Sequence, residues 1–384
     1  NVSHNASVLF ANQADVQSID IDSTITVTPD FETEGRIRAK TGDGTLEGVH
    51  FASTETELDN AFAQVTTGSA IFIDGSYNFP SITSIADDTD KKIRIDTTGL
   101  SIKAQNPNPD STPYLNLNDG TQSYNLSIEA DDVTIEGLQF VAGSSANGHM
   151  VGADSISGLT IQNAILDAQD ATIENAIKTS STDGVTIRNN SISNPYDEEH
   201  SAIFMQGGSN HLITNNTISD YKDGIYLLGT SDSDNPSSGI VVSDNTIEID
   251  DRGVILEAHH DGTEVKDNTI KSGSYSIYSK GSEALMGAPV NTVITGNTLS
   301  GNANQQDYYG IRFIVETDTT TGTDYFESPD QATIENNTFD TIAYDYYLSI
   351  SKDVGSIDWT TIMDNNTFDS SVKVASDGLG IVPE

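Results

Sequence analysis

The chain has 384 residues, of which 58 are Asp or Glu and 17 are Lys or Arg, so its formal net charge is −41; it contains no Cys. The missing Cys excludes disulfide frameworks, thiolate metal sites and thiol nucleophiles. The acid excess repels phosphate backbones and anionic lipids, and no apolar run approaches the roughly 20 residues that span a bilayer, so we expect neither nucleic-acid binding nor membrane insertion.

The N-terminal part predicts a strand, then a short amphipathic helix, then a second strand. Residues 18–28 alternate polar and apolar side chains, as a half-buried strand does. A helix is predicted over residues 54–66, with Ser53 or Thr54 as its N-cap. Its apolar face consists of Leu58, Ala61, Phe62 and Val65. The strand AIFIDGSYNF follows from Ala70.

Internal repetition dominates the rest of the sequence. Nine related segments begin at Val133, Leu159, Val185, His211, Ile240, Thr263, Thr292, Ala332 and Thr361. In seven consecutive copies one slot holds an asparagine: Asn190, Asn216, Asn245, Asn268, Asn297, Asn337 and Asn366. The copies are 23 to 40 residues apart, and each fits two or three short strands joined by polar turns. This is one coil of a parallel β-helix, and the asparagines are predicted to form a hydrogen-bonded ladder along its axis. Leucine-rich repeats share the period, but their strict leucines are missing.

On these repeats the chain resembles the right-handed parallel β-helix superfamily, which includes pectate lyases, alginate lyases and epimerases, and phage tailspikes. The resemblance covers about residues 70–370 and implies an all-β solenoid of about nine to eleven coils. The turn at Gly42–Gly44, the helix and the strand from Ala70 resemble the entry of tailspike-type β-helices. The expected organisation is an N-terminal strand or attachment segment over residues 1–45, a capping helix with the first coils over 46–100, and repeats with the C-terminal end over 101–384.

A second strand follows each asparagine turn, and its alternation separates an inward from an outward set of side chains. The predicted inward set is Met150, Ile177, Ile203, Ile225, Val254, Ile277, Ile311 and Tyr346. The outward positions carry aromatic, amide and basic groups: Lys178, Phe204, Gln206, Tyr226, Tyr278, Lys280, Arg312 and Tyr347. Adjacent coils lie about 4.8 Å apart, so these groups are predicted to form one continuous surface for sugar rings and their carboxylates. A subunit interface and a face covered by a loop are the alternatives.

Catalytic candidates lie beside these second strands. They are His200, Asp223, Arg252, Glu257 and His259. Two carboxylates can serve as acid and base in glycoside hydrolysis, and a Lys, Arg or His near a Tyr can abstract the proton beside a uronate carboxylate. Solvated loop acids on an acidic surface are the alternative interpretation.

No cofactor is expected from the sequence. The clusters DSDN from Asp232 and DDTD from Asp87 offer oxygen ligands for Ca²⁺, but they match no EF-hand spacing. The adjacent His259 and His260 are interpreted as an exposed loop pair, not as a metal site.

The dispersed acids and the 35% of hydrophobic residues favour a folded protein adapted to high salt, where the Debye length falls to about 3 Å. An acidic secreted protein from an ordinary habitat is the alternative. Because Asn1 begins the sequence without a signal peptide, we expect a processed or trimmed end.

The hypothesis is an extracellular or virion-surface β-helix protein of a halophile. It would recognise cell-surface carbohydrate, as a tail spike, fibre or adhesin does, and would form a homo-oligomer. Two alternatives remain: a polysaccharide lyase, epimerase or glycoside hydrolase acting in the same groove, and an architectural filament or surface-layer subunit.

Overall fold

The repeats fold into short strands because β-branched runs are bounded by corner residues in the left-handed conformation. The φ angle is 56° at Asn189, 55° at Asn215 and 56° at Asp244, each one residue before a ladder asparagine. Asn and Asp adopt this conformation more readily than other non-glycine residues, so the corners are specified by the sequence.

The structure is a computed structural model that describes residues 48–383, apart from 76, 79–80, 88, 106–111, 118–124, 143–147, 169–172, 195–199, 303–307, 318, 320, 329–330, 341–343 and 353–356. The predicted strand over residues 18–28 and the turn at Gly42–Gly44 lie outside the described residues. The predicted domain boundaries remain a prediction.

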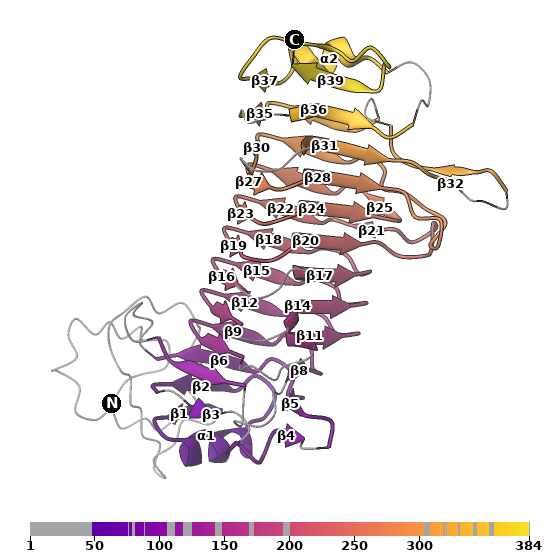
Figure 1. Ribbon diagram of the computed structural model, residues 1–384. Coiled ribbons are helices and arrows are strands. Elements are labelled where there is room, and N and C mark those ends of the chain that lie inside the picture. Colours follow the sequence, from indigo (N-terminus) through magenta and orange to yellow (C-terminus); the bar gives the residue numbers. More distant parts are fainter. Residues whose placement is uncertain are drawn as a thin grey trace, which may run out of the picture.

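Three long sheets wind around one axis (Figure 1). The first sheet contains, in order, β1 (Val49–Ala52), β2 (Ala70–Ile73), β6 (Ser101–Ala104), β9 (Thr134–Glu136), β12 (Thr160–Gln162), β15 (Thr186–Arg188), β18 (Leu212–Thr214), β22 (Val241–Ser243), β26 (Glu264–Lys266), β29 (Val293–Thr295) and β34 (Thr333–Glu335). The second contains β3 (Tyr77–Asn78), β7 (Tyr114–Asn116), β10 (Gln139–Val141), β13 (Ile165–Asp167), β16 (Ser191–Ser193), β19 (Thr217–Ser219), β23 (Thr246–Glu248), β27 (Thr269–Ser272), β30 (Thr298–Gly301), β35 (Thr338–Phe339) and β37 (Thr367–Phe368).

The third sheet holds the longest strands. Its order is β38 (Val372–Val374), β39 (Gly380–Pro383), β36 (Tyr344–Ile350), β31 (Tyr308–Ile314), β28 (Tyr275–Lys280), β24 (Arg252–Glu257), β20 (Asp223–Leu228), β17 (Ser201–Gln206), β14 (Ile173–Ser180), β11 (Gly148–Asp154), β8 (Asn125–Ile128), β5 (Lys92–Ile95) and β4 (Ala86–Asp87). The strands from β5 to β36 pair in parallel, and the sheet ends are antiparallel. The prediction of an all-β parallel solenoid is confirmed.

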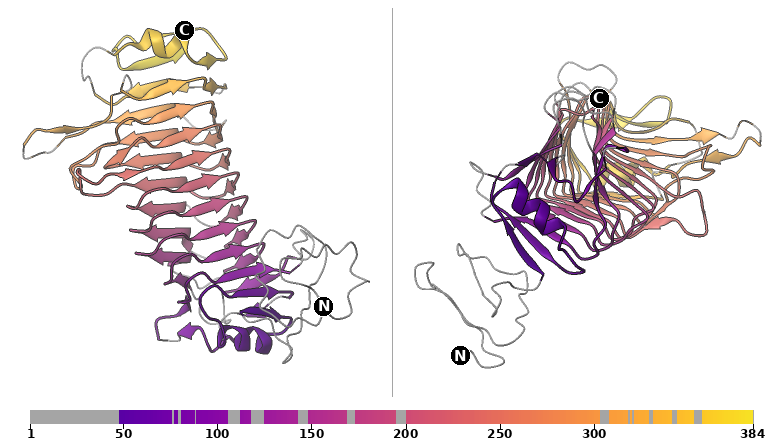
Figure 2. Two further views of the ribbon diagram at one scale, coloured as in Figure 1. Left: turned by 180° about the vertical axis from the view of Figure 1, so that it is seen from behind. Right: turned by 90° about the horizontal axis from the view of Figure 1, so that it is seen from below.

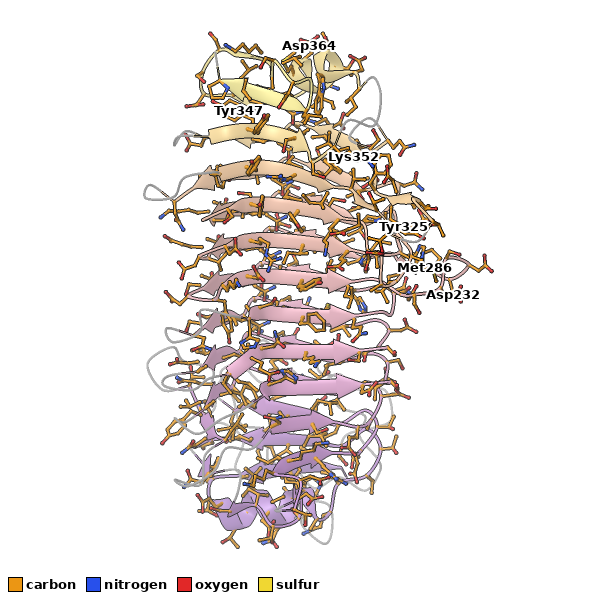
Figure 3. All side chains as sticks on the ribbon, turned by 45° about the vertical axis from the view of Figure 1, so that its right-hand side comes forward. Asp232, Met286, Tyr325, Tyr347, Lys352 and Asp364 are labelled. Atoms are coloured by element: carbon orange, nitrogen blue, oxygen red, sulfur yellow. The ribbon has the colours of Figure 1, made fainter. Side chains whose placement is uncertain are left out.

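Loops from the third sheet project sideways from the coils. Two short sheets lie there, β21 (Ser237–Ser238) with β25 (His260–Asp261) and β32 (Glu316–Thr317) with β33 (Asp324–Tyr325). Figure 3 shows Asp232, Met286 and Tyr325 on this side of the molecule.

The interior is an aliphatic core, since the inward residues of successive third-sheet strands stand in register. Ile177, Ile203, Ile225, Val254, Ile277 and Ile311 pair in sequence and are all fully buried. The next partner is Leu348, not Tyr346, so the predicted register is wrong by two residues in this strand. Tyr346 is paired with Tyr309 instead, and Tyr347 is fully buried among Phe339 and Phe368, with ring centres 5.7 Å and 5.1 Å away.

The seven asparagines form a ladder inside the coil corners. Each side-chain amide donates to the Oδ1 of the next ladder asparagine at 2.9–3.0 Å, from Asn190 through to Asn366. The same Oδ1 also accepts the backbone N–H of the preceding asparagine. This satisfies buried polar groups that water cannot reach.

Both ends of the coil stack are covered. Helix α1 (Glu55–Phe62), capped by Thr54, buries Leu58, Ala61 and Phe62 and closes the first end (Figure 2). At the other end lies α2 (Trp359–Asp364), which buries Trp359 and Ile362. The repeat predicted from Thr361 therefore begins as a helix and not as a strand, although Asn366 still joins the ladder.

Candidate functional site

The outward side of the third sheet carries a row of aromatic and basic side chains. Lys178, Phe204, Tyr226, Ile255, Tyr278 and Arg312 are direct cross-strand partners in that order. All are partly exposed except Ile255, which is buried beneath its neighbours. Gln206 and Lys280 lie two residues further along their strands. The structure thus brings together every predicted surface residue except Tyr347, whose outward placement is wrong because it packs in the core.

A second outward row runs parallel to the first; the sequence analysis named two of its residues, Asp223 and Arg252, as catalytic candidates but missed the row and its tyrosines. The row contains Asp223, Arg252, Tyr275, Tyr309 and Tyr346. The rings of Tyr275 and Tyr309 stack with centres 5.4 Å apart, and those of Tyr309 and Tyr346 stack at 5.5 Å with planes 6° apart. We call the two rows together, with Gln206 and Lys280, the outward face.

Most ring faces on the outward face already have neighbours. Phe204 and Tyr226 meet edge to face at 5.1 Å, and Arg252 lies 5.8 Å from the centre of the Tyr278 ring. The guanidinium of Arg312 covers Tyr309 at 4.1 Å. A ligand would therefore meet ring edges, hydroxyl groups and cationic ends more than open ring faces, which changes the stacking surface that the sequence predicts.

Several tyrosine hydroxyls of this face have no partner within the described part of the chain. Burial raises the pKa of Tyr275, and burial together with Tyr275 raises the pKa of Tyr278 to about 12. The hydroxyls of Tyr275, Tyr278 and Tyr309 make no hydrogen bond with any residue that the structure describes. They are therefore free to donate to a ligand oxygen.

Tyr226 is held differently, because its hydroxyl donates to Oε2 of Glu257 at 2.5 Å. Burial and this hydrogen bond raise the pKa of Tyr226, so the phenol stays protonated and cannot accept a proton as a general base. The other oxygen of Glu257 lies 3.5 Å from Nζ of Lys280, which also approaches Glu316 at 3.5 Å. Glu257 is thus placed between two neighbours on the outward face.

Asp223 and Arg252 form a two-pronged ion pair. Nε and Nη2 of Arg252 donate to the two carboxylate oxygens of Asp223 at 2.8 Å and 2.7 Å, and the Asp223 side chain is 4% exposed. Burial raises the pKa of Asp223, and the guanidinium partly offsets that increase. Both carboxylate oxygens are engaged, which is the arrangement of a structural pair.

The histidines do not converge on one point. His200 lies near His149, whose pKa burial lowers to about 4. His259 pairs across a bridge with Thr230, on the side where the strands end. His260 is 1% exposed and contacts the carbonyl of Leu227 at 3.1 Å, so the interpretation of this residue as part of an exposed loop pair is wrong. Residues 197–199, which precede His200, lie outside the described part.

The two acidic clusters considered for Ca²⁺ are engaged in local turns. Asp232 accepts hydrogen bonds from the backbone of Asp234 and the side chain of Asn235. Asp87 accepts two backbone hydrogen bonds and pairs with Arg94 at 2.9 Å. Within the described ranges, no group of three or more His, Cys, Asp or Glu residues could hold a metal ion. No helix among the described residues is long and apolar enough to cross a membrane.

With this geometry established, the sequence can be compared with known families. A family model described as NosD, periplasmic copper-binding protein, matches residues 155–380, which is more than half of the chain. The chain belongs to the NosD family. No curated protein matches the sequence.

Solved structures of the same fold are similar to this NosD-family chain. The tailspike protein of E. coli bacteriophage HK620 in complex with a pentasaccharide matches with a TM-score of 0.51 and 12% identity, over 79% of this chain and 53% of that one. A double mutant of that tailspike, also with pentasaccharide, has a TM-score of 0.52 and 11% identity, over 83% and 61% of the two chains. A PL6 alginate lyase with a trisaccharide has a TM-score of 0.46 and 16% identity, over 76% and 70%.

At these identities the likeness shows the fold alone. The chain spans about half the length of the tailspike it matches. The predicted right-handed parallel β-helix superfamily is confirmed, while the high-salt habitat stays a prediction.

The family's name raises the question of copper; among the described residues, no three or more His, Cys, Asp or Glu side chains converge on a site that could hold a metal ion. Copper in proteins is held by Cys, Met and His, and this NosD-family chain has no Cys. Met150 and Met205 are buried in the core. His211 is likewise buried, and its Nδ1 accepts the backbone N–H of Val185 at 3.3 Å.

Proposed function

We propose that the outward face binds a polysaccharide outside the cytoplasm, laid along the axis of the solenoid. The observation that carries this proposal is the outward face itself: two parallel rows of hydroxyl, amide and cationic groups extend over successive coils. Sugars offer many oxygen atoms in a regular series, and a regular series of donors suits them.

The charge distribution supports a binding role for this face. The chain carries 58 acidic residues against 17 basic ones, yet Lys178, Arg252, Lys280 and Arg312 gather on the outward face. A surface that only needed solubility would carry acids here. Uncommon groups concentrated on one face favour recognition over solvation.

Binding, not cleavage, is the activity proposed. Asp223 is tied to Arg252, and Glu257 is placed between Tyr226 and Lys280. The tailspikes that share the fold are proteins in complex with a pentasaccharide, which is compatible with a binding surface on such a solenoid. A homo-oligomer, a cell or virion surface and a high-salt habitat belong to the same proposal.

The experiment is a polysaccharide panel at molar salt, with product analysis by unsaturated-uronate absorbance and reducing ends. A test variant combines Tyr278→Ala with Arg312→Ala on the outward face. A matched control combines Thr217→Ala with Thr246→Ala, two exposed cross-strand partners on the second sheet.

We expect at least one polysaccharide to bind the wild type and the control equally, and the test variant tenfold or more weakly, because few anchors dominate such contacts. Equal binding by all three proteins, or no binding across the panel, would refute the proposal. Products that form with the wild type would establish the lyase, epimerase or hydrolase alternative in its place.

A further inference from the structure

The cations of the outward face fall into two kinds, which differ in whether they already have a partner. Arg252 is paired with Asp223, and Lys280 lies between Glu257 and Glu316. Lys178 and Arg312 make no ion pair with any described residue, in a chain where acids exceed bases by 58 to 17. Other described cations, such as Lys92, Arg188 and Lys222, also make no ion pair with a described residue, so what sets Lys178 and Arg312 apart is that both lie in one outward row of the third sheet.

Arg312 is also held in a fixed orientation. Its guanidinium carbon lies 4.1 Å from the centre of the Tyr309 ring and 5.5 Å from that of Tyr275. Its Nε is buried, with no hydrogen-bond partner among the described residues. A guanidinium that stacks on aromatic rings can still donate its in-plane N–H groups to a ligand. A carboxylate accepts two such parallel hydrogen bonds, so it is the acceptor that matches this geometry.

Lys178 repeats this arrangement at the other end of the same row. Its ammonium lies 5.7 Å from the centre of the Phe204 ring. From Lys178 to Arg312 the row passes through Phe204, Tyr226, Ile255 and Tyr278, which is five coil steps. At about 4.8 Å a step, the two cations are separated by roughly 24 Å along the axis. That length corresponds to several sugar units.

We infer that the ligand of the outward face is an acidic polysaccharide, whose carboxylates are bound by Arg312 and Lys178, while the hydroxyls of Tyr275, Tyr278 and Tyr309, on the coil of Arg312 and the coil next to it, bind uncharged oxygens near the Arg312 end. This inference rests on the proposed function and specifies its ligand class. The net charge of −41 repels an acidic polymer at a distance, but salt above about 1 M confines that repulsion to a few ångströms. Direct ion pairs between the polymer's carboxylates and the two cations therefore determine whether it binds.

The test uses matched polymers that differ only in charge. Polygalacturonate, alginate and hyaluronan are immobilised beside their methyl-esterified forms, and binding of the full chain is measured at 1 M and 2 M NaCl. The test variant is Lys178→Gln with Arg312→Gln. Arg312→Lys keeps the positive charge but loses the two parallel hydrogen bonds that a guanidinium can donate to a carboxylate. Lys271→Gln is the control, since Lys271 pairs with Glu248 on the second sheet.

We expect the wild type and the control to bind at least one acidic polymer tenfold or more tightly than its ester. The double variant should lose that preference, and Arg312→Lys should keep part of it, while all melting temperatures stay close to that of the wild type. Equal binding of acid and ester, binding of none of the acidic polymers, or an unchanged preference in the double variant would overturn the inference. Binding of neutral polysaccharides in the wider panel would then leave the proposed function standing on its own.

Discussion

The guanidinium of Arg312 lies 4.1 Å from the centre of the Tyr309 ring, and both side chains leave the same strand, β31, on its outward side. Tyr309 is itself stacked between Tyr275 and Tyr346 on the two neighbouring coils. The row of rings therefore holds the guanidinium at a fixed height above the sheet. This relationship connects the solenoid register to the proposed binding site, because the coil repeat sets the spacing of the rings.

The asparagine ladder gives the first prediction. Asn268 accepts from the backbone and the side chain of Asn245 and donates to Asn297, in a buried corner. Asn268→Leu leaves those partners unsatisfied and should lower the free energy of unfolding by roughly 1–3 kcal/mol. Asn60→Leu, on the exposed side of α1, is the control and should change it by less than about 0.5 kcal/mol. Chemical denaturation measures both, and equal stability of the two variants would contradict the ladder's role.

The buried ion pair gives the second prediction. Asp223→Asn leaves the guanidinium of Arg252 without its carboxylate and should destabilise the fold by about 3 kcal/mol. Replacing both residues with Leu should recover most of that loss, because two well-packed apolar residues remove the unpaired charge. Thermal melting of the single and double variants measures the difference. If the double Leu variant were as unstable as Asp223→Asn, the unpaired guanidinium would not be the cause of the instability, and the prediction would be wrong.

The pH dependence of stability gives the third prediction. Burial lowers the pKa of His260 to about 4, below the ordinary value of 6.5 that it has when unfolded. Between these values the unfolded chain binds a proton that the folded chain does not, so stability falls as the pH decreases from 6.5 towards 4, by about 3 kcal/mol from this residue. His149, also lowered to about 4, acts in the same direction.

His260→Gln should reduce this slope of stability against pH, which denaturation at successive pH values measures. The comparison is made with His259→Gln, on the neighbouring and more exposed residue. An identical slope in wild type and His260→Gln would show that His260 is not the buried neutral group described here.

The charge balance gives the fourth prediction. With a net charge of −41, self-repulsion should destabilise the fold when NaCl falls from molar concentration to about 0.05 M, because the Debye length increases severalfold. The melting temperature should therefore rise with NaCl, in differential scanning fluorimetry or calorimetry. A melting temperature that does not depend on NaCl would exclude the halophile hypothesis.

Much of the fold could be predicted from the sequence, because its determinants are local and repeat. Helix α1 begins at the predicted N-cap Thr54, and β2 begins at the predicted Ala70. The asparagine slot fixes the phase of each coil, so most of the inward and outward positions of the third sheet follow by simple alternation. The terminal strand escaped this reasoning because Tyr347 occupies the position that Gly310 holds in the neighbouring strand, so Tyr347 and Leu348 both face inward and the register moves by two residues. The large side chain of Tyr347 packs there against Phe339 and Phe368, and no local pattern encodes that contact.

The second row of the candidate site was missed for a different reason. Strict alternation fails at the start of the third-sheet strands, where two consecutive residues face inward. Added Cβ atoms at Gly224 and Gly253 would lie 2.8 Å and 2.3 Å from the side chains of Ile247 and Ile270, so both glycines face the core. The residue before this small position therefore returns to the outward side: Asp223 and Arg252 precede the two glycines, and Tyr275 and Tyr309 precede Ser276 and Gly310 at the same position of the next two strands. The recurring small residue before each inward Ile or Val was the signal in the sequence.

The central claim, that the outward face binds a polysaccharide, is tested most directly by hydroxyl-radical footprinting with the polysaccharide that binds best in the panel. Tyrosine is a good reporter, and Tyr114, which is 41% exposed on the second sheet, is an internal control. The account predicts that bound polysaccharide lowers the oxidation rates of Tyr275, Tyr278 and Tyr309 severalfold and leaves that of Tyr114 unchanged. Unchanged rates at the three outward tyrosines under saturating polysaccharide, or protection of Tyr114 instead, would contradict it.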